Sequence, residues 1–171
     1  AALRCASGIV TLGVPESLNP IMESKLTCVM THPLPETKVS TLSNKGKKKI
    51  IKLCESHDVV ALGPGLSQQP ETRELILWLI QNIDRSMVID ADGLNALSEN
   101  VNVLQKIKRH AVLTPHPGEM SRLAGLGSAK DVQKDRLNTA SQFIQSIQKK
   151  SNNERRLILV LKGDKTIVTD R

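Results

Sequence analysis

Four short segments of this sequence combine residue types that can bind ligands or transfer groups. They are Gly63-Pro64-Gly65, Asp90 to Asn95 (DADGLN), Thr114 to Glu119 (TPHPGE) and Lys162 to Thr166 (KGDKT). Each one follows a short apolar run that is typical of a buried strand. In an open α/β sheet, ligands bind beyond the carboxyl ends of the strands. If the sheet is parallel, all four segments converge on one site.

The glycine segment could bind an anion. Gly63 and Gly65 flank Pro64 at the end of an apolar run, and Pro70 marks the start of a helix soon after. Glycine lets backbone N–H groups approach an anion closely, and a helix start adds partial positive charge. An ordinary turn between a strand and a helix would use the same glycines. The segment lacks the Lys-Ser/Thr of a P-loop.

The acidic segment offers two carboxylates two positions apart. Asp90 and Asp92 could hold Mg²⁺ through water or orient a sugar hydroxyl. Alternatively, Asp92 caps the next helix, with Asn95 in its first turn, and Asp90 is structural.

The third and fourth segments carry a histidine and a lysine. His116 stands between two prolines and could hydrogen-bond a substrate or exchange a proton near neutral pH, although a lone histidine is often structural. Glu119 either favours a helix N-terminus or places a metal near phosphates. Lys162 ends an apolar strand, where its burial needs an anionic partner unless it turns into water. With Gly163 and Thr166 it could line a nucleotide.

Alternating strand-like and helix-like runs surround these segments and predict a mostly parallel sheet wrapped by helices. A long helix capped by Ser128 is expected to bury Leu137, Ala140, Ile144 and Ile147. The predicted strands are 9–14, 28–31, 58–62, 86–89, 111–114, 157–161 and 165–169. The predicted helices are 18–25, 42–56, 103–109 and 115–125, with others beginning at 70, after 92 and at 128, and residues 151–155 form a polar loop.

Length and composition limit the function classes. The 171 residues suit one domain, here 1–171. The only aromatic residues are Trp78 and Phe143, so the chain lacks the stacking platforms of single-stranded nucleic-acid binders. The net charge of +7 suits an anionic partner, and much of it lies in the lysines of 45–52. Those lysines are predicted to form the solvated face of a helix, with a nucleic-acid patch as the weaker alternative.

Cysteine usage and hydropathy point to the cytoplasm. Three cysteines lie far apart without CxxC or histidine pairing, which argues against a disulfide framework or a zinc site and fits a reducing compartment. No apolar run is long enough to span a membrane, and no signal peptide is visible. The chain starts without Met in a helix-like run and stops after a strand-like run, so we expect a domain truncated at both ends.

Taken together and in order, the motifs GPGL (63–66), DADGLN (90–95), LTPHPGE (113–119) and LKGDKT (161–166) resemble the dehydratase domain that repairs hydrated NADH and NADPH. The similarity runs from about Ala6 to the end of the chain. It implies a ribokinase-like fold, a three-layer αβα sandwich. It also implies a hydro-lyase activity, in which ADP or ATP phosphorylates the hydroxyl of the hydrated nicotinamide ring and phosphate then leaves.

The resemblance also implies roles for individual residues. Gly65 and His116 would contact the hydrated dinucleotide, NAD(P)HX, and the same substrate site would include Gly63, Asp92, Asn95 and Glu119. Lys162, Gly163, Asp164, Lys165 and Thr166 would line the adenine nucleotide. Glu119, with Asp92, would help to position Mg²⁺ and phosphates. A histidine in this motif resembles the bacterial form, which favours ADP over ATP.

One departure from the family pattern concerns catalysis. The family carries a Gly-Thr-Gly-Asp segment whose backbone forms an anion hole and whose Asp is the base, and no GTGD occurs in these 171 residues. The glycine-rich opening strand of the fold is also missing. The catalytic base is therefore unknown, and we expect this chain alone to be inactive, because phosphoryl transfer depends on positioning and electrostatics.

Other functions stay open at this point. A kinase of the same fold would act on a vitamin-precursor alcohol, but its relatives have Asn-x-x-Glu where His116 to Glu119 stands. A non-catalytic nucleotide-binding module would explain the missing GTGD. A basic nucleic-acid binder rests on the lysine run alone. We expect no membrane or nucleic-acid partner, and a homo-oligomer is compatible with the sequence.

Overall fold

Strands and helices alternate along the chain in the computed structural model, which describes residues 2–148 and 156–170. The strands are β1 (Thr11–Pro15), β2 (Met30–Leu34), β3 (Val59–Leu62), β4 (Ser86–Ile89), β5 (Ala111–Leu113), β6 (Leu157–Leu161) and β7 (Ile167–Thr169). The α-helices are α1 (Asn19–Lys25), α2 (Lys47–Glu55), α3 (Pro70–Asn82), α4 (Asp92–Glu99), α5 (Pro117–Leu123), α6 (Ala129–Lys134) and α7 (Arg136–Gln148). Short 3-10 helices span Ala2–Cys5, Glu16–Leu18, Asn44–Gly46 and Val101–Lys106.

The strands form two sheets. Strands β1 and β2 pair in parallel, and the larger sheet has the order β3-β4-β5-β6-β7. Neighbours from β3 to β6 are parallel, and β7 pairs antiparallel with β6 after the predicted turn at residues 163–164. The expected α/β class with a mostly parallel sheet is therefore confirmed.

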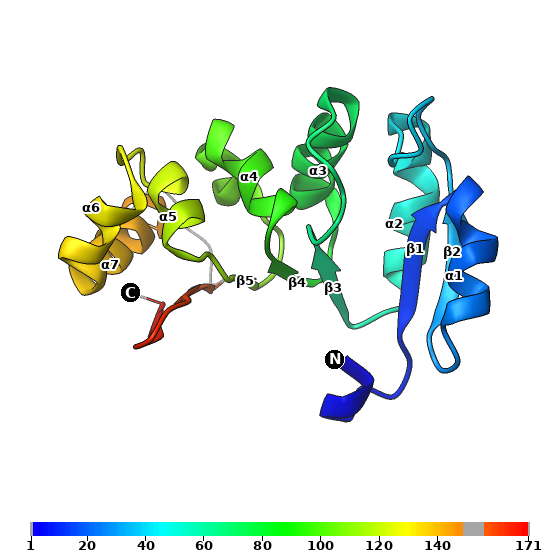
Figure 1. Cartoon of the computed structure of the whole chain (residues 1–171), viewed down its shortest axis with the longest axis horizontal. Helices are drawn as coiled ribbons and strands as arrows, with labels where there is room; N and C mark the ends of the chain where they lie inside the picture. The colour runs from blue at the N-terminus through cyan, green and yellow to red at the C-terminus, as the bar shows by residue number, and fades with distance from the viewer. Residues whose placement is uncertain (1, 149–155, 171) are drawn as a thin grey trace.

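Helices cover one face of the larger sheet. Figure 1 shows α3, α4 and α5 on the same side of strands β3, β4 and β5. The register places Leu62, Ile89, Leu113 and Leu159 in one row across four strands, and all four side chains are buried. The adjacent row contains Ala61, Val88, Val112 and Ile158, and none of these is fully buried. The described residues thus supply the sheet and one of the two helical layers of the expected sandwich.

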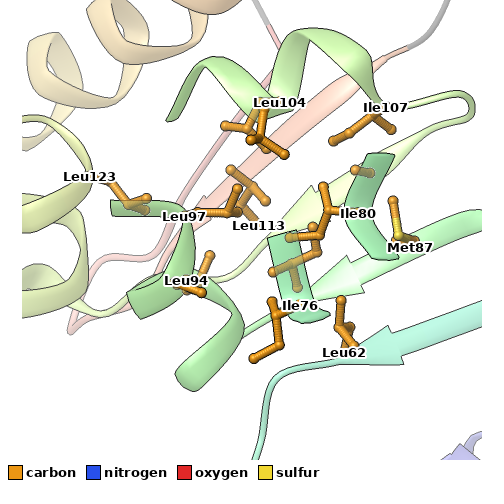
Figure 2. Close-up of a cluster of buried hydrophobic side chains, with 14 of the residues drawn as sticks. Leu62, Ile76, Ile80, Met87, Leu94, Leu97, Leu104, Ile107, Leu113 and Leu123 are labelled. Carbon is orange, nitrogen blue, oxygen red and sulfur yellow. The ribbon is translucent and has the colours of Figure 1, made fainter. Parts of the chain in front are cut away.

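The core lies between this covered face and helices α3 and α4. Figure 2 shows Ile76 and Ile80 of α3 and Leu94 and Leu97 of α4 gathered with side chains of the strands. The predicted buried face of α3 is confirmed, since each of its five apolar residues is at most 1% exposed. Each such side chain stabilises the fold by about 1.5–3 kcal/mol relative to an exposed one. The residues of that face are Leu75, Ile76, Leu79, Ile80 and Ile83.

The single long helix predicted from Ser128 is wrong. Asp135 has non-helical backbone angles (φ −152°, ψ 81°) and separates α6 from α7. Its carboxylate accepts a hydrogen bond from the backbone N–H of Asn138 at 3.0 Å, which competes with continuous helix. Leu137 is 65% exposed, whereas Ala140, Ile144 and Ile147 are buried as expected.

Two other predicted elements differ in type or limits. Residues 103–109 were expected to form an α-helix, but a 3-10 helix spans Val101–Lys106. The basic helix is shorter than predicted, because a 3-10 turn precedes α2. It buries Ile50 and Cys54 and exposes Lys48, Lys49 and Lys52, as the solvated-face interpretation requires. The predicted loop 151–155 lies outside the described residues.

Across residues 2–148 and 156–170, no helix is both long and apolar enough to cross a bilayer. Cys5, Cys28 and Cys54 are all free thiols, and only Cys54 is buried. Burial raises the pKa of the Cys54 thiol, which keeps it protonated and unreactive.

Candidate functional site

The four chemically distinctive segments meet at one edge of the larger sheet, as their positions predicted. Backbone bonds join each to its neighbour: Asp90 N donates to Leu62 O at 3.1 Å, and Thr114 N donates to Ile89 O at 3.2 Å. Lys162 N donates to Pro115 O at 2.8 Å. The edge is thus a continuous rim formed by the carboxyl ends of β3, β4, β5 and β6.

The two glycines at the end of β3 have different environments. Gly63 has φ +134°, and a Cβ there would overlap the carbonyl oxygen of Asp90, so the close packing of neighbouring turns explains this glycine. Gly65 has φ +75°, and nothing lies within 4 Å of the Cβ it lacks. Packing therefore does not explain Gly65, which leaves open space beside the backbone at the rim.

Asp92 holds the glycine turn. Its Oδ2 accepts a hydrogen bond from Ser67 N at 2.9 Å, and its Oδ1 accepts one from Asn95 Nδ2 at 3.4 Å. The N-cap of α4 is Ala91, and no side chain caps that helix, so the interpretation of Asp92 as the cap is wrong. Ala91 and Ser67 both have positive φ (49° and 78°), a conformation that is costly without glycine.

Arg122 of α5 extends this network, although no motif in the sequence indicated this residue. Its Nη2 donates to Asn95 Oδ1 at 2.8 Å. None of the ion pairs found within the described residues includes Arg122. An arginine without a carboxylate partner therefore adds positive charge beside Asn95.

His116 and Glu119 form a reciprocal cap at the start of α5. Nδ1 of His116 accepts hydrogen bonds from Gly118 N at 3.0 Å and Glu119 N at 3.3 Å. Oε2 of the buried Glu119 accepts from His116 N at 2.8 Å. Because Nδ1 is an acceptor, the neutral imidazole carries its hydrogen on Nε2. The ring is about half exposed and its Nε2 lies 3.5 Å from Glu119 Oε1, so the Nε2 side of the ring has a carboxylate neighbour and is still within reach of a ligand.

Lys162 finds its anionic partner within the protein. Its Nζ donates to Asp90 Oδ1 at 2.8 Å, so the interpretation of Lys162 as a turn lysine directed into water is wrong. Partial burial raises the pKa of Asp90, but hydrogen bonds from Lys162, the Ala91 backbone and Thr114 outweigh burial and hold that pKa below its usual value. Asp90 is therefore ionised at neutral pH, and its bond to Lys162 is compatible with the structural role predicted for it.

The loop of Lys162 to Lys165 rests on Arg136, a second arginine that the sequence did not reveal. A Cβ at Gly163 would lie 2.6 Å from Arg136 Nη1, so this glycine makes room for a guanidinium group. Thr166 Oγ1 donates to Gly163 O at 3.2 Å, and Asp164 and Lys165 complete the loop. All predicted site residues therefore lie in rim segments or in the helix starts that follow them.

The described residues contain no preformed metal site. No group of three or more His, Cys, Asp or Glu side chains is placed to hold a metal ion within 2–148 and 156–170. The carboxylates of Asp90, Asp92 and Glu119 all accept hydrogen bonds from the protein. A cation at this rim would need most of its ligands from elsewhere, such as phosphate oxygens.

Comparison with known proteins gives a consistent result. The family model described as NAD(P)H-hydrate dehydratase matches residues 1–171. The chain is 39% identical over 168 residues to the bifunctional NAD(P)H-hydrate repair enzyme Nnr of Moorella thermoacetica. The alignment covers 98% of the chain and 30% of that protein. It is 35% identical over 170 residues to Nnr of Escherichia coli, covering 98% of the chain and 28% of that protein.

Solved structures agree at the level of the fold. A ribokinase-like superfamily protein from Enterococcus faecalis superimposes with a TM-score of 0.69 at 17% identity, covering 98% of this chain and 51% of that one. A hypothetical protein from Streptococcus mutans gives the same score at 21% identity, covering 99% and 54%. The chain spans about 30% of the length of its first curated relatives.

Proposed function

Because this chain belongs to the NAD(P)H-hydrate dehydratase family, we propose that its protein uses ADP or ATP to dehydrate NAD(P)HX back to NADH or NADPH. The observation that carries the proposal is the rim itself. Four segments are joined there by direct hydrogen bonds, one of which links residues 72 positions apart in the chain. Such an edge is where open α/β sheets bind nucleotides.

The proposed substrate site combines the glycine turn with the cap of α5. Gly65 leaves open space for close approach to the backbone, and His116 offers Nε2–H as a donor to the hydrated nicotinamide portion. Gly63, Asp92, Asn95 and Glu119 would support this site mainly by fixing its loops. Arg122 adds positive charge that suits a substrate with a pyrophosphate.

The proposed nucleotide site is the loop of residues 162–166. Lys162 would bring a charge already balanced by Asp90, so backbone groups and the neighbouring Gly163 to Thr166 would make most contacts with ADP or ATP. The histidine at position 116 favours ADP as the phosphoryl donor.

Mg²⁺ belongs to this proposal only as an ion that arrives with the phosphates. The buried carboxylate of Glu119 is occupied by the backbone of His116, so binding a metal would compete with the cap of α5. We therefore assign no reaction step to a protein-held metal.

The base that accepts the substrate's hydroxyl proton would come from a GTGD segment, which these 171 residues lack. In this proposal the rim residues bind and orient the reactants, and removal of the proton falls to the GTGD segment. We propose a cytoplasmic enzyme, in accord with its three free thiols, and no nucleic-acid partner.

Calorimetric titration of the 171-residue chain with ADP and with hydrated NADPH tests the proposal. We expect both to bind, and restoration of the dihydronicotinamide absorbance only when a GTGD-containing segment is present. Failure of both ligands to bind, together with binding of a hydroxymethyl-pyrimidine or pyridoxal-like alcohol, would replace the dehydratase with a kinase of the same fold. Salt-sensitive binding of DNA would instead support the nucleic-acid alternative.

A further inference from the structure

The guanidinium group of Arg136 forms hydrogen bonds to the backbone around the loop that follows β6. Arg136 is the first residue of α7, and its Nη2 donates to the carbonyl oxygens of Leu161, Lys162 and Lys165 at 3.2, 3.3 and 3.0 Å. Its Nη1 donates to Gln133 Oε1 at 3.1 Å. One side chain of α7 thus bonds to three carbonyl groups, one at the end of β6 and two in the loop that follows it.

The positive charge of Arg136 is not neutralised by these contacts. All four acceptors are uncharged, and none of the ion pairs found within residues 2–148 and 156–170 includes Arg136. Lys162 differs, because Asp90 balances its charge. Arg136 therefore adds a positive charge beside the loop that no carboxylate in these ion pairs balances.

The clamp also fixes the direction of backbone N–H groups. The peptide unit is planar and trans, so its N–H points opposite to its carbonyl. Lys162 N–H, which belongs to the same peptide unit as the Leu161 carbonyl, donates to Pro115 O at 2.8 Å. Gly163 N–H and Thr166 N–H belong to the units of the other two clamped carbonyls. Neither has an acceptor in the described part of the chain.

We propose that Arg136 is a positioning residue, which turns the carbonyl groups of the loop inward so that Gly163 N–H and Thr166 N–H face an anionic nucleotide. The identity of the ligand rests on the proposed function, whereas the clamp rests on geometry alone. A Cβ at Gly163 would displace the guanidinium from this position, and the φ of +156° at that residue also favours glycine. Paired backbone donors beside positive charge form a favourable environment for phosphate oxygens.

Two substitutions separate charge from geometry. Arg136→Gln removes both the charge and the three-way clamp, and Arg136→Lys keeps the charge but loses the planar donor group. Arg109→Gln is the matched control, because Arg109 lies before β5 at the opposite edge of the sheet and pairs with Asp84. Residue-resolved amide exchange and ADP titration are measured for each, and thermal unfolding confirms that each variant is folded.

In both Arg136 variants we expect faster exchange of the Lys162 amide and unchanged exchange in the centre of β6. ADP affinity should fall about tenfold or more in Arg136→Gln, which loses both the charge and the clamp. It should fall less in Arg136→Lys, because lysine keeps the positive charge. In the unsubstituted chain, ADP should slow exchange at Gly163 and Thr166. Arg109→Gln should leave unchanged the exchange of the Lys162 amide, the affinity for ADP and the slowing of Gly163 and Thr166 exchange by ADP.

Unchanged Lys162 exchange in a folded Arg136→Gln variant would overturn the clamp. Equal ADP affinity in that variant and the unsubstituted chain would overturn its role in ligand binding. If the unsubstituted chain does not bind ADP, the proposed function fails instead, and Lys162 exchange still decides whether Arg136 positions the loop.

Discussion

Lys162 Nζ lies 2.8 Å from Asp90 Oδ1, although the two residues are 72 positions apart in the chain. The pair joins the end of β6 to the end of β4 across the intervening strand β5. Because its side chains are 42% and 31% exposed, we expect a modest energetic contribution and a larger role in fixing the geometry of the rim.

Asp90→Asn should lower the free energy of unfolding at pH 7 by no more than about 1 kcal/mol, as for other partly exposed ion pairs. The pKa of Asp90 is lowered in the folded state, so the contribution of its charge is complete well above the unfolded value of about 3.9. It is lost as the pH falls through the folded pKa. Urea unfolding at several pH values measures the difference.

Asp58→Asn is the control for that series, since Asp58 is exposed and lies at the opposite end of the strands. Its free energy of unfolding should differ little from that of the unsubstituted chain. An Asp90→Asn effect that stays constant on acidification would show that the charge of Asp90 is not what stabilises the rim.

Substitutions of His116 should separate its structural role from its proposed binding role. His116→Ala removes the acceptor for Gly118 N and Glu119 N and should cost about 1 kcal/mol of stability, whereas asparagine is itself a good N-cap and should cost little. Both lose the Nε2–H donor, so both should bind hydrated NADPH more weakly. Normal binding by a folded His116→Asn variant would contradict the proposed contact.

The two glycines after β3 should respond differently to alanine. Gly63→Ala would force a Cβ against the carbonyl oxygen of Asp90 and should destabilise the fold by about 3 kcal/mol or more. Gly65→Ala meets no atom within 4 Å and should cost only the left-handed conformation, about 1–2 kcal/mol. Chemical denaturation compares them. If both variants lost the same free energy of unfolding, the turn would have to adjust around a Cβ at position 63.

Arg122→Gln should weaken binding of hydrated NADPH and reduce its dependence on salt, because a positive charge without a carboxylate partner is removed beside Asn95. Titrations at two ionic strengths measure both effects, with Arg109→Gln as the control. A variant with unchanged affinity at low salt would exclude Arg122 from contact with the charged part of the substrate.

Local signals predicted much of the fold. Apolar runs flanked by charged residues predicted the limits of β4 (Ser86–Ile89) and β6 (Leu157–Leu161), and Pro70 marked the start of α3. The helix break at Asp135 was missed because apolar spacing continues across it, whereas a single side-chain bond to Asn138 N decides the local structure. The outward position of Leu137 follows from the same break.

The location of the rim could be predicted from the sequence, but the contacts between its side chains could not. Motif positions and parallel strands are enough to bring its segments together. The partners of Lys162 and of the loop it begins depend on how separate elements pack. Asp90 reaches Lys162 from two strands away, and Arg136 reaches the loop from the start of α7, so no spacing in the sequence identifies either residue.

The half-covered sheet has a thermodynamic consequence. Ala61, Val88, Val112 and Ile158 line the face without helices, and their apolar surface is already partly hydrated in the folded chain. Unfolding these 171 residues therefore exposes less new apolar surface than unfolding a sheet covered on both faces. Its heat-capacity increment should lie below the usual value of about 12–15 cal/mol/K per residue. Any partner that covers this face would raise that increment, so a calorimeter would register the covering directly.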